Sequence, residues 1–528
     1  MANELLKGET SMHTDSKVFR RQAIRICVAM MPVLAWLSGY SVAHAELRFA
    51  GIFSDHMVLQ RERSIPVWGW ADKGRVVTVQ FAGQSVSAKV NDDGTWQAIL
   101  KPLAASDESR KLVAACDSET VVVADAVVGD IWHASGQSNM AMNVQAVAKH
   151  FSKAEADMAA AELPTIRFRR IDESESAMPR KDIPIKAGWS VCSPNTVGGF
   201  SAAAFYFARK LQGELDVPIG IVDTSRGGTP IEPFIPRAPF NAHPTLLREL
   251  ELGDQEDLLG IWKLPGGVRA RDANWLPGRL FHSRLAPIIR FAARGAIWYQ
   301  GESNCGDGED PRDYRHKMRA LITGWRTELG NDALPFYFVQ LPGSGARAGW
   351  PYLREQQRLS LGLPHTGMAV TIDLFHEDIH PPNKFDVGER LARLALADEY
   401  GRKVPYSGPL FERVEIADGR AVVFFTHAES GLITAIKDGL AEPKEDRAIS
   451  LTHFELADQA GTWHRADATI DGATVIVRNE RLPRPAAVRY AYAINPQQCR
   501  LYNRDGLPAA PFCSHPELLK FEPDLPRE

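Results

Sequence analysis

A serine stands where a chain of this pattern would place a nucleophile. Ser138 follows an apolar, strand-like stretch at 126–134 that breaks at Gly136, and the residues after it resemble the start of a helix. A turn from strand to helix exposes a side chain at the edge of a sheet and leaves free backbone N–H groups beside it. The turn could therefore hold a nucleophilic hydroxyl and part of an oxyanion site. Serine also favours turns and helix caps for structural reasons, so catalysis must be argued from other residues as well.

A histidine further along the chain could activate this serine. A hydroxyl is a weak nucleophile until a base with a pKa near the working pH accepts its proton, and His380 fits that role by position. Two prolines follow it and would hold the loop rigidly. An acid must orient the imidazole; we favour Asp378, with Glu377 and Asp373 as alternatives. A solvated acidic loop with an idle histidine is the competing interpretation.

Two other polar turns follow predicted strands. The segment 224–230 contains Gly227 and Gly228, and glycine lets backbone amides approach a ligand closely, although an ordinary tight turn would use the same residues. The segment 298–304 places Gln300 and Glu302 at a strand end. There the amide of Gln300 could stabilise an oxyanion, and the carboxylate of Glu302 would lie in the same crevice.

The elements that would position these residues form an α/β fold. Apolar strands alternate with helix-like stretches such as 202–215 and 314–329, and this alternation predicts a parallel sheet. The predicted strands are 126–134, 217–223, 295–299, 335–341 and 367–373. Open sheets of this kind bind ligands beyond the carboxyl ends of their strands, which is where the candidate residues lie.

Short alternating strands flank this region on both sides. They predict a small β-sandwich before it and a second β domain after about residue 406. We therefore divide the chain into a signal peptide at 1–45, an N-terminal β-sandwich domain at 46–125, an α/β catalytic domain at 126–404 and a C-terminal β domain at 405–528.

The first 45 residues have the features of an export signal. Three arginines precede an apolar run at 26–40, and Ala43-His44-Ala45 has the small-x-small pattern of a cleavage site, with Met1 or Met12 as the start. The run falls short of the roughly 20 residues that a spanning helix needs, which favours a signal peptide over the alternative of a membrane anchor. We expect a periplasmic or secreted protein with no stable membrane insertion after cleavage.

Composition excludes several classes of protein. The chain has 528 residues, of which 45% are hydrophobic and 24% charged, which argues against disorder, and its net charge of −4 offers no basic surface for nucleic acid. Of six cysteines, one lies in the predicted signal, and Cys499 and Cys513 are close enough in sequence to form a disulfide. No pair has zinc-ligand spacing, so we expect no metal or other cofactor. The oligomeric state stays open.

Six ordered motifs carry a resemblance to a known family. They are GQSNM at 136–140, RGGTPIE at 226–232, AIWYQGESN at 296–304, PFYFVQL at 335–341, YLREQQ at 352–357 and DIHPPNKFDVGERLA at 378–392. Together they resemble the sialate O-acetylesterases, within the SGNH hydrolases. The segments 53–71 and 501–512 resemble the first and last parts of the same family. The resemblance implies an SGNH-hydrolase-like parallel sheet sandwich flanked by N-terminal and C-terminal β domains.

The resemblance also implies roles for the candidate residues. Ser138 would be the nucleophile and His380 the base, and the oxyanion site would combine Ser138 N–H, the Gly227-Gly228 turn and Gln300. Many SGNH enzymes have asparagine where this chain has Gln300. The family's acid usually stands three residues before the histidine, where this chain has glutamate, so a Ser–His dyad is an alternative to the triad with Asp378.

The expected activity is hydrolysis of O-acetyl esters on sugars through an acetyl-enzyme. The family's substrates include acetylated xylan or xyloglucan oligosaccharides and O-acetyl sialic acid, and we favour the polysaccharide class. Two other functions compete with this interpretation. One is a non-catalytic polysaccharide-binding protein, and the other is a glycosidase that uses Glu302 and Asp378 as its paired carboxylates.

Overall fold

One 18-residue strand, β8 (Glu119–Gly136), runs through both of the first two predicted regions. Its first part pairs with the antiparallel strand β7 (Ser106–Cys116) and the parallel strand β2 (Met57–Gln60). Its second part pairs in parallel with β11 (Ile219–Asp223) and β12 (Gly295–Tyr299). The predicted boundary between residues 125 and 126 therefore falls inside a single strand. This computed structural model describes residues 46–184, 188–259, 275–306, 310–344, 347–374 and 376–521.

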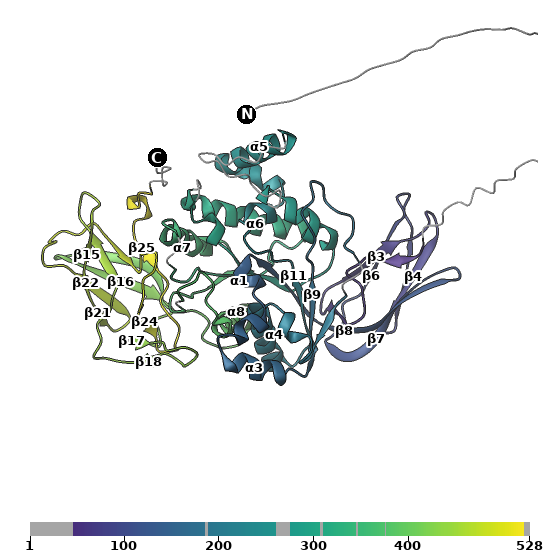
Figure 1. The fold of residues 1–528 in the computed structure, drawn as a ribbon, viewed down its shortest axis with the longest axis horizontal. Helices are drawn as coiled ribbons and strands as arrows, with labels where there is room; N and C mark the ends of the chain where they lie inside the picture. Colours follow the sequence, from purple (N-terminus) through teal and green to yellow (C-terminus); the bar gives the residue numbers. More distant parts are fainter. Residues whose placement is uncertain are drawn as a thin grey trace, which may run out of the picture. The chain divides into compact units, whose positions relative to one another are not determined.

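The central sheet is mostly parallel and has helices on both faces. Its strand order is β10-β9-β11-β8-β12-β13-β14, in which only β10 (Ser190–Cys192) is antiparallel to its neighbour β9 (Leu163–Arg170). β13 (Phe336–Val339) and β14 (Thr366–Ala369) complete it. Figure 1 shows α6 (Tyr314–Glu328) and α7 (Trp350–Leu359) on one face, with α4 (Ala202–Leu215) and α8 (Lys384–Asp398) packed together on the other. Coverage on both faces explains why these strands are almost continuously buried.

The predicted α/β alternation is confirmed. The stretches predicted at 202–215 and 295–299 are α4 and β12 with the same bounds, and the other predicted strands overlap β8, β11, β13 and β14. The strands β9 and β10 were not predicted from the sequence. The remaining α-helices are α1 (Ser138–Ala141), α2 (Val144–Ala148), α3 (Ser152–Ala159) and α5 (Pro244–Leu259).

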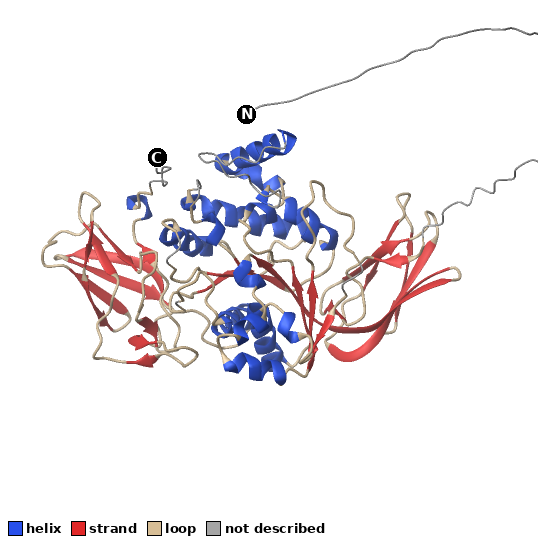
Figure 2. Cartoon of the chain, in the orientation of Figure 1, coloured by secondary structure: helices blue, strands red, loops and turns tan. Residues whose placement is uncertain are grey.

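Antiparallel strands lie before and after this sheet in the sequence, and Figure 2 draws them in red. The earlier strands are β1 (Arg48–Phe49), β3 (Ile65–Trp70), β4 (Val76–Phe81), β5 (Gln84–Lys89) and β6 (Thr95–Leu100). The later ones form three small sheets. These contain β15 (Leu410–Ala417), β16 (Arg420–Thr426), β22 (Thr474–Arg478) and β21 (Asp467–Asp471); β18 (Lys444–Glu445), β17 (Leu432–Ile436) and β24 (Leu501–Asn503); and β20 (Trp463–Arg465), β19 (Phe454–Ala457), β23 (Ala487–Tyr490) and β25 (Phe512–Cys513).

Five cysteines lie buried in the described ranges; Cys116, Cys192, Cys499 and Cys513 are free thiols, and the fifth is Cys305. The disulfide considered for Cys499 and Cys513 is therefore not formed. Their side chains point to different backbone carbonyls: Cys499 Sγ lies 3.1 Å from Pro496 O, and Cys513 Sγ lies 3.4 Å from His515 O. The predicted signal peptide at 1–45 lies outside the described residues. Within those residues, no helix is both long and apolar enough to cross a bilayer.

Candidate active site

Ser138 and His380 meet at the carboxyl end of β8. Ser138 is the first residue of α1, two residues after Gly136, the last residue of the strand. Gly136 has a φ of +132°, and a Cβ there would lie 2.1 Å from the carbonyl oxygen of Tyr299, so the bend requires glycine. Nε2 of His380 lies 2.8 Å from Oγ of Ser138, although 242 residues separate them in sequence. At this distance the imidazole can accept the hydroxyl proton.

Among the three predicted acids, Asp378 is the one at hydrogen-bond distance from the histidine. Its Oδ1 lies 2.7 Å from Nδ1 of His380 and also accepts the backbone N–H of His380 at 3.1 Å. Slight burial raises the pKa of Asp378, but its hydrogen bonds to His380 and the charge of that ring outweigh burial and lower the pKa overall. Asp373 is instead buried in an ion pair with Arg390 at 2.7 Å, and Glu377 is exposed.

The Gly227-Gly228 turn lies beside the serine. Beyond the end of β11, Thr224 N–H donates to Ala134 O and Arg226 N–H donates to Gly136 O, both at 2.9 Å, which extends the β11–β8 pairing into the turn. A Cβ at Gly227 would lie 3.6 Å from Cβ of Ser138. The absence of a side chain at Gly227 thus leaves space directly next to the Ser138 side chain.

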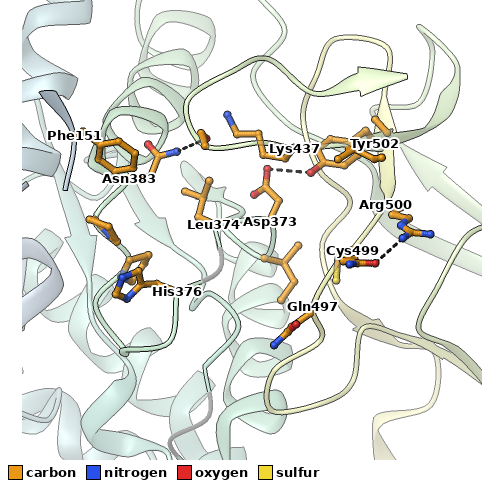
Figure 3. A pocket seen from close by; sticks show the side chains of 17 residues that line it. Phe151, Asp373, Leu374, His376, Asn383, Lys437, Gln497, Cys499, Arg500 and Tyr502 are labelled. Carbon is orange, nitrogen blue, oxygen red and sulfur yellow. Dashed lines mark hydrogen bonds between the residues drawn. The ribbon is translucent and has the colours of Figure 1, made fainter. Parts of the chain in front are cut away.

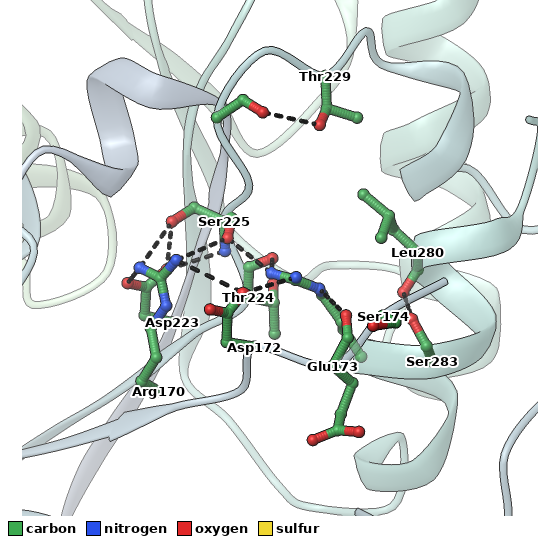
Figure 4. A network of polar contacts seen from close by, with 12 residues as sticks. Arg170, Asp172, Glu173, Ser174, Asp223, Thr224, Ser225, Thr229, Leu280 and Ser283 are labelled. Carbon is green, nitrogen blue, oxygen red and sulfur yellow. Dashed lines mark hydrogen bonds and ion pairs between the residues drawn. The ribbon is translucent and has the colours of Figure 1, made fainter. Parts of the chain in front are cut away.

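A buried polar network fixes this turn (Figure 4). The carboxylate of Asp223 accepts hydrogen bonds from the N–H (2.9 Å) and hydroxyl (2.6 Å) of Ser225 and from Arg170 (2.7 Å). Arg284 is fully buried and donates to Ser225 O and to Asp172, each at 2.7 Å. Burial lowers the pKa of Arg284, and the charge of Asp172 opposes that shift. The motif around Ser138 did not predict that Asp223, Ser225 and Arg284 support the turn.

Gln300 lies in the site but is already hydrogen-bonded on both ends of its amide. Its Nε2 is 2.7 Å from Asn304 Oδ1, 3.1 Å from Gln137 Oε1 and 3.3 Å from Thr229 O, and its Oε1 accepts from Tyr314 at 2.5 Å. Both amide hydrogens therefore have acceptors within the described protein. This arrangement does not support the expected role of Gln300 as an oxyanion donor; the amide instead braces Gln137, the residue before the serine.

Glu302 belongs to a second buried cluster, together with Asn139 and Lys384, which were not predicted as site residues. Its Oε1 accepts from Nδ2 of Asn139 at 2.5 Å, while Oε2 is buried and has no hydrogen-bond partner among the described residues. Lys384 Nζ donates to Oδ1 of Asn139 at 2.6 Å. Burial raises the pKa of Glu302, against the effect of its hydrogen bond from Asn139. Asn139 lies in the GQSNM motif, and Lys384 lies in the DIHPPNKFDVGERLA motif.

A cavity of about 490 Å³ lies next to the loop that carries His380 (Figure 3). Its walls come from that loop, from the C-terminal strands and their connections, and from Phe151 before α3. The prolines that directly follow His380 line it, and so do aromatic rings and side chains with amide or cationic groups. These include Phe151, His376, Tyr502, Asn383, Lys437, Gln497, Gln498 and Arg500. Such a lining combines flat apolar faces with hydrogen-bonding groups.

Known proteins resemble this chain over most of its length. Residues 128–397 match the family described as carbohydrate esterase, sialic acid-specific acetylesterase. Sialate O-acetylesterase of Rattus norvegicus is 28% identical, with 88% of this chain and 94% of that protein covered. The Homo sapiens protein of the same name is 27% identical, with 92% and 95% covered.

A solved structure extends the likeness to three dimensions. A carbohydrate acetylesterase from Xanthomonas citri superposes with a TM-score of 0.77 and 34% sequence identity, and the match covers 88% of this chain and 99% of that one. The family match spans the strands and turns that bring Ser138 and His380 together. The chain therefore belongs to the sialic acid-specific acetylesterase family of carbohydrate esterases and is a carboxylic ester hydrolase.

Proposed function

We propose that this protein is an exported serine esterase that removes O-acetyl groups from carbohydrates through an acetyl-enzyme. The 2.8 Å contact between Ser138 Oγ and His380 Nε2 carries the proposal. His380 takes the hydroxyl proton as Ser138 attacks the acetyl carbonyl, and it returns that proton to the departing sugar oxygen. Water then attacks the acetyl-enzyme with His380 again as base, which releases acetate and frees the serine.

Backbone amides are the best candidates for the oxyanion donors. Ser138 begins α1, and the first N–H groups of a helix have no partner within the helix. The Gly227-Gly228 turn adds further backbone N–H groups on the side where a Cβ would contact Ser138. Gln300 supports the site by bracing Gln137. Preorganised donors of this kind stabilise the charge that develops on the carbonyl oxygen.

We propose an acetylated oligosaccharide as the substrate. The mammalian relatives are named for sialate and the Xanthomonas protein for carbohydrate. These names are compatible with O-acetyl sialic acid and with acetylated oligosaccharides as substrates. The cavity beside the loop favours an extended sugar, because aromatic rings pack against sugar faces while Gln497 and Gln498 supply groups that bond hydroxyls. The simultaneous replacement of Gln497 and Gln498 by alanine should raise KM for the oligosaccharide and leave KM for p-nitrophenyl acetate unchanged.

The arrangement of the chain is part of the same proposal. Residues 1–45 would direct export and be removed, and 126–404 would form the SGNH-like catalytic domain. The regions 46–125 and 405–528 would flank it as β domains. The strand pairing of β8 supports close integration of the first two regions.

The test compares substrates and a serine variant. The chain from Glu46 onward is incubated with p-nitrophenyl acetate, acetylated xylo-oligosaccharides and O-acetylated sialic acid, beside Ser138→Ala and the surface control Ser87→Ala. Acetate release that disappears only in Ser138→Ala supports the serine mechanism, and the preferred substrate identifies the sugar. Equal release by Ser138→Ala contradicts it. Cleavage of glycosidic bonds by that variant would instead support a glycosidase, and sugar binding without any reaction would support a binding protein.

A further inference from the structure

The residues on either side of His380 are held by buried hydrogen bonds. Asn139 Nδ2 donates to the carbonyl oxygen of Ile379 at 2.9 Å, and Lys384 Nζ donates to that of Pro381 at 2.7 Å. Lys384 also donates to Oδ1 of Asn139 at 2.6 Å. These contacts join Asn139 and Lys384 into a clasp that grips the backbone before and after His380.

The clasp is also tied to the serine. Asn139 directly follows Ser138 in α1, and its Nδ2 donates to Oε1 of Glu302 at 2.5 Å. On the other side of the serine, Oε1 of Gln137 accepts the N–H of Ser303 at 3.1 Å. The segment after β12 therefore fixes both neighbours of Ser138, while Asn139 reaches across to the histidine loop.

The clasp is shielded from water. Asn139 and Lys384 have no exposed surface, and Glu302 is 3% exposed. Burial lowers the pKa of Lys384 to about 7, although the charge of Glu302 opposes this. A neutral amine keeps two N–H groups, which suffice for the two acceptors of Lys384. The grip on the loop therefore persists in either protonation state.

We propose that Lys384, acting through Asn139, is a positioning residue that sets His380 at its working distance from Ser138. The inference rests on the esterase mechanism proposed above. The side chain of Asp378 is 61% exposed, so water competes for its hydrogen bond to the imidazole. The carbonyls gripped by the clasp have buried donors that hold the loop without such competition. Loss of these hydrogen bonds would let the imidazole of His380 move, and a misplacement of about 1 Å can lower the rate by about 100-fold.

Lys384→Met is the direct test, because it keeps a long apolar side chain but cannot donate. The matched control is Lys210→Met, which removes a lysine from a surface ion pair with Glu214 on α4. Each variant is assayed for kcat and KM with p-nitrophenyl acetate and with an acetylated xylo-oligosaccharide. The first leaving group departs without a proton, whereas the sugar oxygen needs one from His380.

We expect Lys384→Met to lower kcat for p-nitrophenyl acetate by about 100-fold with KM little changed. The loss should be larger for the sugar ester, since a displaced His380 then fails as base and as acid. Lys210→Met should match the wild type. Wild-type kcat in Lys384→Met, or an equal loss for both substrates in step with a reduced folded fraction, overturns the proposal.

Two further variants separate the possible failures. If Lys384→Met does not fold, Asn139→Ala breaks the same clasp from the serine side and should show the same larger loss for the sugar ester; wild-type kinetics there overturn the inference. Ser138→Ala is assayed in parallel. An active Ser138→Ala contradicts the proposed function itself, whereas an inactive Ser138→Ala beside a fully active Lys384→Met contradicts only the role of Lys384.

Discussion

Asp378 hydrogen-bonds the imidazole of His380 at 2.7 Å from a position where 61% of its own side chain is exposed. In the serine-protease triad the corresponding aspartate is buried, and its loss drops the rate by about 10⁴-fold. An exposed carboxylate shares its hydrogen bond with water and orients the ring less strongly. The distance thus resembles that of a triad, while the environment is closer to that of a dyad.

The first prediction concerns this acid. Asp378→Asn should lower kcat by about 10- to 100-fold, well short of the loss at a buried triad aspartate, because part of the ring's orientation comes from elsewhere. Glu377→Gln, one residue earlier and exposed, is the matched control and should be close to wild type. Steady-state kinetics with p-nitrophenyl acetate measure both. A greater loss in Glu377→Gln would assign the acid to Glu377.

The two glycines of the turn should respond differently to alanine. Gly227→Ala places a methyl group 3.6 Å from Ser138 Cβ and should reduce kcat by about tenfold, since it fills the space next to the nucleophile. Gly228 has a φ of +69° with open space around it, so Gly228→Ala should lower the free energy of unfolding by about 1 kcal/mol. Urea denaturation and kinetics on both variants separate the effects. Matching profiles would contradict the assignment.

The stability contribution of Lys384 should depend on pH. Its pKa is about 7 in the folded chain and about 10.4 when unfolded. Between these values the unfolded chain binds a proton that the folded chain lacks, so this group makes the wild type more stable as pH rises. The free energy of unfolding of the wild type minus that of Lys384→Met should therefore grow by up to about 1.4 kcal/mol per pH unit. Urea denaturation at pH 7.5, 8.5 and 9.5 measures it, and a constant difference would contradict the shift.

Arg284 should be indispensable to the turn beside the serine. It donates to Ser225 O, Asp172 and the backbone of Glu173 from one buried guanidinium, a geometry that a lysine ammonium cannot reproduce. Arg284→Lys should lower the free energy of unfolding by about 2 kcal/mol. Arg413→Lys, at a half-exposed surface pair, is the control and should change little. Equal effects of the two substitutions on denaturation midpoints would contradict the role.

Thiol counting tests the cysteines. A chain that begins at Glu46 has five cysteines, and all five are buried. We expect almost no reaction with a thiol reagent in the native state and five equivalents in guanidinium without reductant. Three equivalents in guanidinium would reveal a disulfide.

The pairing of Ser138 with His380 was predictable, because the carboxyl ends of parallel strands meet at one edge of a sheet. The bounds of β12 and α4 were also predictable from apolar runs and helical periodicity. The direction in which Gln300 and Lys384 point was not, since a motif gives the order of side chains and not their neighbours. Only the folded chain brings Tyr314 to one end of the Gln300 amide and Asn304 to the other.

Buried charges explain the missed and merged strands. β9 contains Arg167 and Arg169, and arginines do not predict a central strand. Arg169 is nonetheless 2% exposed and donates to the backbone oxygens of Gly51 and Pro184. The boundary predicted between residues 125 and 126 falls next to Asp125, whose carboxylate pairs with Arg167 at 3.1 Å inside the continuous strand β8. Partners distant in sequence made both strands possible.

The continuity of β8 has a consequence for any attempt to trim the enzyme. A truncation that starts at residue 126 would strip the pairing partners β2 and β7 from the strand whose far end presents Ser138. The exposed edge would fray toward the nucleophile or recruit a second molecule. The shortest active fragment should therefore begin before β2. The regions 46–125 and 126–404 should also unfold in a single thermal transition. A graft of the active site onto another protein would have to include both regions.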